Sequence, residues 1–126
     1  MQTHYERLGG SDTLRKLVDR FYDLMDEDPD YYGIRKLHPA DLTESRNKLV
    51  WFLSGWTGGP PEYSDRFGHP FLRRRHLPFA VGVAERDQWM ACMTRAMQAV
   101  GVDAAMRQEL GAALFKTADF MRNQPE

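Results

Sequence analysis

Residues 71–79 read FLRRRHLPF: three consecutive arginines lead directly into His76, with large apolar side chains on both sides. Pro70 precedes the stretch and suits the first turn of a helix, because that turn leaves its N–H groups without intrahelical partners. Pro78 cannot continue a helix, so the helix should end near Leu77. The pattern therefore predicts a helix of about two turns with His76 at its end.

This combination of charge and apolar surface has two interpretations. The first is a solvated arginine face, with His76 favoured at a helix C-terminus because its positive charge complements the helix dipole. The second is a haem site, since haem needs one axial imidazole, an apolar slot and cations for its two propionates. From this stretch alone the solvated face is the favoured interpretation.

Composition limits the wider possibilities. The chain has 126 residues, 42% of them apolar, which suits a single domain over residues 1–126. A formal net charge of −1 is untypical of a nucleic-acid binder, so no nucleic-acid partner is expected. Cys92 is the only cysteine, which excludes an intrachain disulfide and a CxxC motif. The sequence lacks a signal-peptide pattern and a membrane-spanning apolar run, so we expect a soluble cytoplasmic protein.

Apolar residues recur at helical spacing in four long segments, and little of the chain alternates like a strand. The fold class is therefore all-α, and the predicted helices cover residues 12–27, 41–56, 84–100 and 103–122, with shorter ones over 31–37 and 70–77. Residues 58–70, GGPPEYSDRFGHP, are predicted to form a long irregular loop, a kind of segment that is often functional. The start of the chain around His4 is expected to be frayed.

The histidines do not form a recognisable metal motif. Their spacings match neither HExxH nor a pair on one helix face, so a zinc site with several ligands is not predicted; the four are His4, His38, His69 and His76.

Five motifs together favour the interpretation of His76 as part of a haem site. They are YERLGG (5–10), FYDLM (21–25), HPADL (38–42), GGPPEYSDRFGHPFLRRRHLPF (58–79) and ERDQWMACM (85–93). In this order and spacing they closely resemble the truncated haemoglobins of group II, which are bacterial two-over-two globins. The resemblance covers roughly residues 3–122. It implies a truncated globin fold, a two-over-two helical sandwich around haem b.

The resemblance also implies roles for individual residues. His76 matches the proximal histidine, the one protein ligand of the iron. Tyr22 and Trp89 match distal residues whose O–H and N–H groups can donate to a bound ligand. His38 falls at a pocket position where the family carries tyrosine, phenylalanine or histidine, and its charge could change near physiological pH.

Further positions belong to the same predicted site. Ser45 falls where classical globins carry a distal histidine, and Leu49 lies one helical turn further on. Lys48, Tyr63 and Arg75 match positions that can meet the propionates. The apolar candidates for the porphyrin walls also read as ordinary core; they are Phe21, Phe52, Leu53, Phe71, Leu72, Phe79 and Met93.

The function implied by the resemblance is binding of O₂, NO, CO or peroxide at a His76-ligated iron. Distal donors would slow O₂ release, which favours redox chemistry of a peroxidase-like or NO dioxygenase-like kind, served by an unidentified reductase, over bulk oxygen transport. A haem-based gas sensor and a haem-free helical interaction protein stay open as alternatives. The protein is expected to be a monomer or a homodimer.

Overall fold

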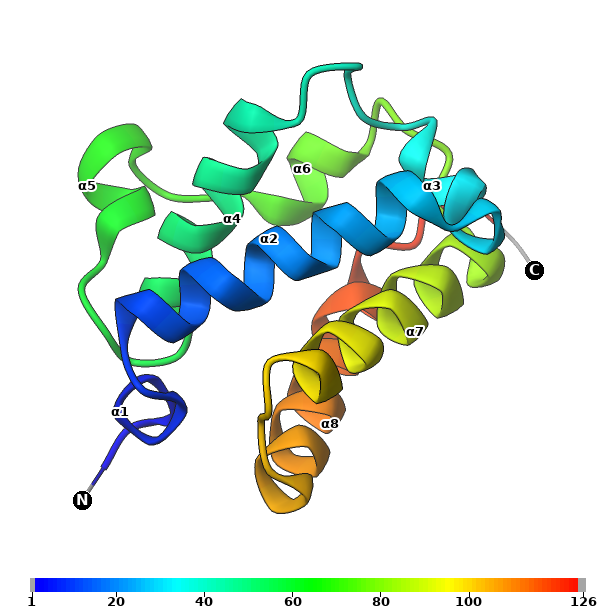
Figure 1. Ribbon diagram of the computed structural model, residues 1–126. Helices are drawn as coiled ribbons and strands as arrows, with labels where there is room; N and C mark the ends of the chain where they lie inside the picture. The colour runs from blue at the N-terminus through cyan, green and yellow to red at the C-terminus, as the bar shows by residue number, and fades with distance from the viewer. Residues whose placement is uncertain (1, 125–126) are drawn as a thin grey trace.

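Two pairs of long helices build the molecule, and the computed structural model describes them within residues 2–124. Helix α2 (Ser11–Glu27) packs against α4 (Thr43–Trp56), and α7 (Val83–Ala99) packs against α8 (Ala104–Phe120). The two pairs meet where α2 lies on α7 (Figure 1). This confirms the predicted all-α class and its arrangement of two helices over two. Within the described chain no helix is long and apolar enough to cross a membrane.

The long helices begin and end close to the positions that local sequence signals predicted. Helix α2 ends at Glu27, just before Asp28, which precedes Pro29 and has an extended backbone. Helix α8 starts after Asp103, whose side chain accepts a hydrogen bond from the Met106 N–H. Both boundaries are set by residues next to them in the sequence, so local sequence signals were sufficient to predict them.

The short elements differ more from expectation. Between α2 and α4 lie a 3₁₀ turn, Pro29–Tyr31, and helix α3 (Tyr32–Arg35). The predicted irregular loop over 58–70 is wrong in its middle, because α5 (Glu62–Phe67) forms there. Tyr63 is buried and its ring packs edge-on against Phe52 of α4, at 6.4 Å between centroids. This tertiary contact anchors a turn that has no apolar periodicity.

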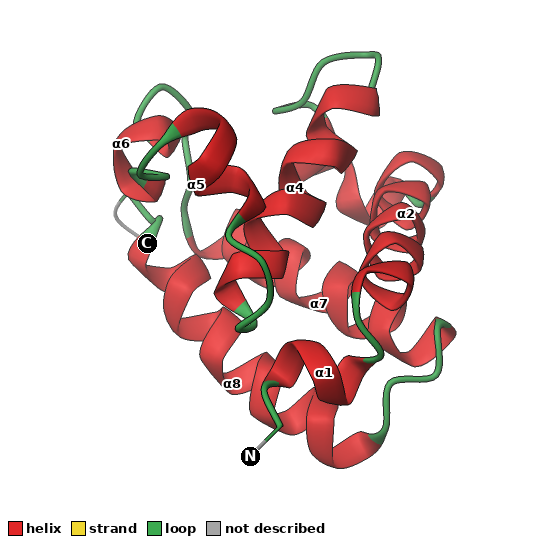
Figure 2. Cartoon of the chain, turned by 90° about the vertical axis from the view of Figure 1, so that its left-hand side faces the viewer, coloured by secondary structure: helices red, strands yellow, loops and turns green. Residues whose placement is uncertain are grey.

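The expectation of a frayed N-terminus is also wrong. Helix α1 (His4–Leu8) is closed by a capping box, in which Thr3 and Glu6 each accept from the other's backbone N–H. The Tyr5 N–H donates to the Thr57 carbonyl at 2.9 Å and so ties α1 to the end of α4. Figure 2 shows α1 below α4 and α5 at this end of the molecule.

Helix α6 (Leu72–His76) is shorter than the predicted helix over 70–77. It begins after Phe71 instead of at Pro70, because Phe71 adopts a left-handed backbone with φ of 47°. This conformation is uncommon for a bulky residue and cannot be part of a right-handed helix. His76 nevertheless stands at the end of the helix, as predicted.

The centre of the core is the contact between α2 and α7. Phe21 of α2 and Cys92 and Met93 of α7 are fully buried there. The Cys92 thiol donates to the Phe21 backbone carbonyl at 3.2 Å. Burial raises the pKa of the Cys92 thiol to about 12, so the group stays protonated at neutral pH.

We therefore expect Cys92 to resist alkylation in the native protein. Only the thiolate reacts efficiently, and a raised pKa combined with burial leaves almost none accessible. Iodoacetamide labelling at pH 8, followed by mass spectrometry, should modify Cys92 only after unfolding in denaturant. Rapid labelling of the native protein would contradict this placement in the core.

Candidate functional site

A cavity of about 900 Å³ opens between the two helix pairs. Its volume lies within the roughly 300–1,000 Å³ typical of ligand and cofactor sites. All of the predicted site residues except three line it: Tyr22, His38, Ser45, Lys48, Leu49, Phe52, Leu53, Tyr63, Leu72, Arg75, His76, Phe79 and Trp89. Side chains far apart in the sequence therefore converge on one space.

His76 reaches the cavity from the end of α6 and is half-buried. Its Nδ1 lies 2.7 Å from the Leu72 carbonyl oxygen. A carbonyl oxygen can only accept, so Nδ1 carries a proton, and in the neutral ring Nε2 has the lone pair. This hydrogen bond orients the ring and leaves Nε2 as the atom able to bind a metal.

Tyr22 of α2 and Trp89 of α7 line the same cavity. Both rings pack against the buried Phe21, with centroids at 5.0 Å and 5.2 Å respectively. Burial raises the pKa of the Tyr22 hydroxyl, which therefore remains a protonated donor. The Tyr22 hydroxyl and the Trp89 indole N–H make no hydrogen bond with another group in residues 2–124, so both donors are available to a ligand in the cavity.

His38 lies just beyond α3, with its ring edge-on to Tyr22 at 5.7 Å between centroids. Its Nδ1 donates to the Ile34 carbonyl at 2.8 Å, so the neutral ring leaves Nε2 as an acceptor. Arg35 holds the connection that follows, donating to the carbonyls of Pro39 and Ala40 at 2.9 Å and 3.0 Å. Sequence patterns did not single out Arg35, because its partners are recognisable only in the folded chain.

Helix α4 contributes Ser45, Lys48 and Leu49, which share one face because residues three and four apart are neighbours on a helix. The Lys48 ammonium pairs with Glu44 at 2.9 Å. Both of these side chains are substantially exposed, so the ammonium can exchange this partner for an anionic group at little cost.

Arg75 and Tyr63 border the cavity near α5 and α6. The Arg75 guanidinium lies 6.0 Å from the centre of the Tyr63 ring, and its Nε donates to the Pro70 carbonyl at 2.8 Å. With Lys48, Arg75 gives this part of the cavity two positive charges beside apolar walls. Such a rim suits an apolar molecule that carries carboxylates.

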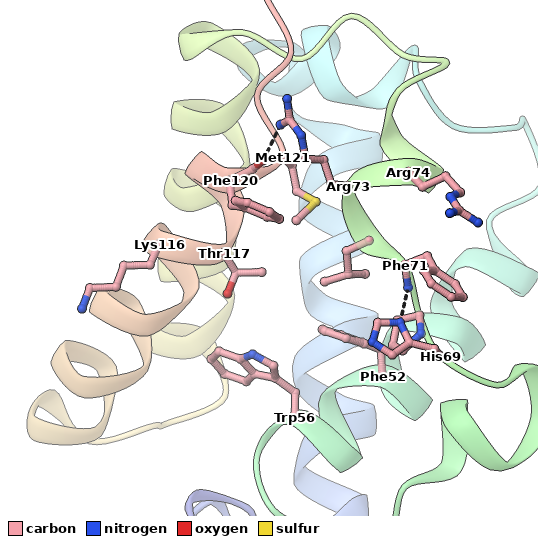
Figure 3. Close-up of a pocket in the computed structure, with 12 residues that line it drawn as sticks. Phe52, Trp56, His69, Phe71, Arg73, Arg74, Lys116, Thr117, Phe120 and Met121 are labelled. Carbon is pink, nitrogen blue, oxygen red and sulfur yellow. Dashed lines mark hydrogen bonds between the residues drawn. The ribbon is translucent and has the colours of Figure 1, made fainter.

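Three residues predicted to contact the porphyrin do not line the cavity. Phe21 and Met93 are fully buried in the core between α2 and α7. Phe71 is 47% exposed and belongs to a separate groove between α4, α6 and α8, where its ring packs at a tilt against His69 (Figure 3). The left-handed backbone of Phe71 sets its direction, which residue type and spacing do not reveal.

The structure also adds lining residues that the sequence did not assign to the site. The apolar ones are Ile34, Leu37, Pro39, Trp51, Val81, Leu114, Ala118 and Met121, and the polar or charged ones are Asp41, Thr43, Glu44, Asn47, Glu85, Arg86 and Thr117. Those on α8 belong to its apolar stripe, which predicted burial without distinguishing the core from the cavity wall.

The chemistry of the lining fits a haem better than a bare metal ion. Across residues 2–124, no three His, Cys, Asp or Glu side chains gather in a way that could hold a metal. A metal bound by His76 would therefore need its other ligands from a cofactor. The cavity combines the oriented imidazole of His76, apolar walls and the cations of Lys48 and Arg75, which together match the three features that haem requires.

Comparison with known proteins agrees with this geometry. The family model for bacterial-like globins matches residues 3–123, and the chain belongs to this family, whose truncated globins bind haem and gases. The chain is 41% identical to the group 2 truncated hemoglobin YjbI of Bacillus subtilis over 122 residues, covering 97% of this chain and 89% of the relative.

Solved structures give the same class. The group II 2-on-2 hemoglobin of the plant pathogen Agrobacterium tumefaciens is 44% identical with a TM-score of 0.95, covering 99% of this chain and 97% of that one. The truncated oxygen-avid haemoglobin of Bacillus subtilis is 39% identical with a TM-score of 0.89, covering 97% of this chain and 100% of that one. The predicted truncated globin fold is therefore confirmed.

His38 should make stability depend on pH. Its pKa is lowered, first because burial disfavours the charged ring, with Arg35 and His76 adding to the effect and the Ile34 hydrogen bond opposing it. The unfolded chain then binds this proton more readily, so the free energy of unfolding should fall as pH drops below about 6.5.

The His38→Phe variant lacks this contribution. Its free energy of unfolding, measured by urea denaturation at several pH values between about 5 and 7.5, should vary less steeply than that of the wild type. Equal slopes in the two proteins would contradict a buried, neutral His38.

Proposed function

We propose that this protein binds haem b with His76 as the protein ligand of the iron, and that Tyr22 and Trp89 hold a diatomic ligand beside it. The observation that carries this proposal is the hydrogen bond from His76 Nδ1 to Leu72, which leaves Nε2 free inside a largely apolar cavity. Bound haem would supply a redox-active iron for O₂, NO, CO or peroxide.

The chain's own residues would do three things. His76, oriented by Leu72, would hold the cofactor at one axial position. Tyr22 and Trp89 would donate hydrogen bonds to a partly anionic ligand, each bond contributing roughly 0.5–3 kcal/mol. Neutral His38 would accept through Nε2 and would become a donor only when protonated.

Two other groups complete the proposed site. Lys48 and Arg75 would pair with the propionates, and Tyr63 would lie beside them. Ser45 and Leu49 would occupy the α4 side of the ligand space, without a histidine at the classical distal position.

Two donors at the ligand favour slow O₂ release. The similar Bacillus subtilis protein is described as oxygen-avid, which supports the same property here. Tight retention suits redox chemistry of O₂, NO or peroxide, supplied with electrons by a reductase in the cytoplasm, better than bulk transport. Turnover of peroxide or NO in the presence of a reductant would distinguish this function from a gas sensor, which would bind without turnover.

The first test concerns the iron ligand. His76→Ala should lose haem, or need added imidazole to regain a histidine-ligated absorption spectrum, because the variant lacks the imidazole that α6 presents to the cavity. His4→Ala is the matched control, since His4 lies on α1 away from the cavity, and it should keep the wild-type spectrum. A normal spectrum in His76→Ala without imidazole would overturn the assignment.

The second test concerns the distal donors. Trp89→Phe and Tyr22→Phe keep an aromatic ring and remove one donor, so stopped-flow O₂ release should accelerate several-fold, up to about a hundredfold. The double variant should be non-additive because both donors share one acceptor. Trp56→Phe is the control, since Trp56 lines the separate groove between α4, α6 and α8 and not the central cavity. Unchanged release in Trp89→Phe would show that this indole does not hold the ligand.

A further inference from the structure

Helix α6 carries His76, yet little apolar packing holds it in place. None of its five residues is buried. The residues at its two ends, Phe71 and Leu77, are 47% and 55% exposed. A groove of about 770 Å³ separates its outer side from α8 and α4 (Figure 3). A helix this short and this exposed needs other interactions to keep one position.

The three arginines of α6 have different partners, and only Arg73 reaches α8. Its guanidinium Nη1 donates to the carbonyls of Phe120 and Arg122, both at 2.8 Å. The final carbonyls of a helix have no intrahelical donors, so a charged donor at this point satisfies groups that need partners. Arg74 instead lies over the Phe71 ring at 4.7 Å, and Arg75 bonds to Pro70 within its own segment.

Asn123 forms a second connection from the same end of α8. Its Nδ2 donates to the carbonyls of His76 and Phe79 at 3.1 Å and 2.8 Å. Its Oδ1 accepts from the Val81 N–H at 3.0 Å, and its own backbone N–H donates to the Val81 carbonyl at 2.8 Å. The side-chain amide of Asn123 thus both donates and accepts hydrogen bonds with backbone groups of residues 76–81.

The His76 carbonyl itself takes part in this arrangement. It accepts from the Phe79 N–H at 2.9 Å and from Asn123 Nδ2 at 3.1 Å, so both of its lone pairs are engaged. The Leu72 carbonyl meanwhile orients the His76 ring. The ring and the backbone of the same residue are therefore fixed separately, and Asn123 acts on the backbone.

We propose that Arg73 and Asn123 are positioning residues for His76, and that residues 120–123 form a C-terminal brace that holds α6 at the correct distance from the cofactor. This inference rests on the proposed haem function. Neither residue lines the central cavity, so both act through α6 and its following loop without touching the ligand. The brace sets the geometry of the proximal bond, while Tyr22 and Trp89 independently set ligand release.

The test compares variants that remove the brace with one that leaves it intact. Asn123→Asp keeps an acceptor for the Val81 N–H and removes both donations to the His76 and Phe79 carbonyls, and Arg73→Ala removes the bonds to α8. Arg74→Ala is the control, because Arg74 is an adjacent arginine without a hydrogen bond to α8.

Two measurements on the haem-loaded protein report the proximal side. Transfer of haem to excess apomyoglobin should be roughly 10–100-fold faster in Asn123→Asp and Arg73→Ala, as for other residues that support a metal ligand. The iron–histidine stretching band in resonance Raman spectra of the ferrous protein should shift or broaden. Arg74→Ala should match the wild type in both, and O₂ release should stay within about twofold in all three variants, since distant sites act independently.

The outcomes separate the possible roles. The positioning role would be contradicted if Asn123→Asp and the double variant Arg73→Ala/Asn123→Asp both keep the wild-type stretching band and rate of haem transfer. This holds even if their melting temperatures fall, because a loss of stability alone shows only that the contacts stabilise the fold. The proposed haem function predicts that the wild type shows an iron–histidine band and that His76→Ala does not. If the wild type shows no such band, the proposed haem function itself fails.

Discussion

The packing of α2 against α7 is the contact on which the rest of the structure depends. Phe21 is fully buried at this contact, and the rings of Tyr22 and Trp89 both pack against it. Because the core itself supports both donors, their direction does not rely on a mobile loop. A cavity-forming substitution at Phe21 would cost roughly 3–5 kcal/mol and would disturb both donors together.

The two walls of the cavity are held by different forces. The Tyr22 and Trp89 side is built on buried apolar contacts, which are non-directional and extend over long helices. The His76 side is built on a short, unburied helix held by hydrogen bonds to Asn123 and to the end of α8. Within this helix the Leu72 carbonyl orients the His76 ring. Hydrogen bonds are directional, so they suit the side on which one imidazole must keep a defined geometry.

The environment of Tyr22, His38 and His76 at the cavity favours one protonation state or one tautomer of each side chain. Burial keeps Tyr22 protonated and favours neutral His38, and carbonyl acceptors select one tautomer at both His38 and His76. The two histidine rings are oriented by the same kind of hydrogen bond. Each donates through Nδ1 to the carbonyl four residues earlier, which presents Nε2 to the cavity.

The primary structure was sufficient for the long helices and for the position of His76 at a helix end. Through the family resemblance it also located about half of the residues that line the cavity. Helical periodicity and proline act over a few residues, so a local pattern reveals them. Only the folded chain shows that Phe71 turns away from the cavity and that α5 forms around Tyr63. The same holds for the hydrogen bonds of Arg73 and Asn123, whose partners lie 49 and 47 positions away in the sequence. These features follow from backbone torsion and long-range contact, which residue type and spacing do not encode.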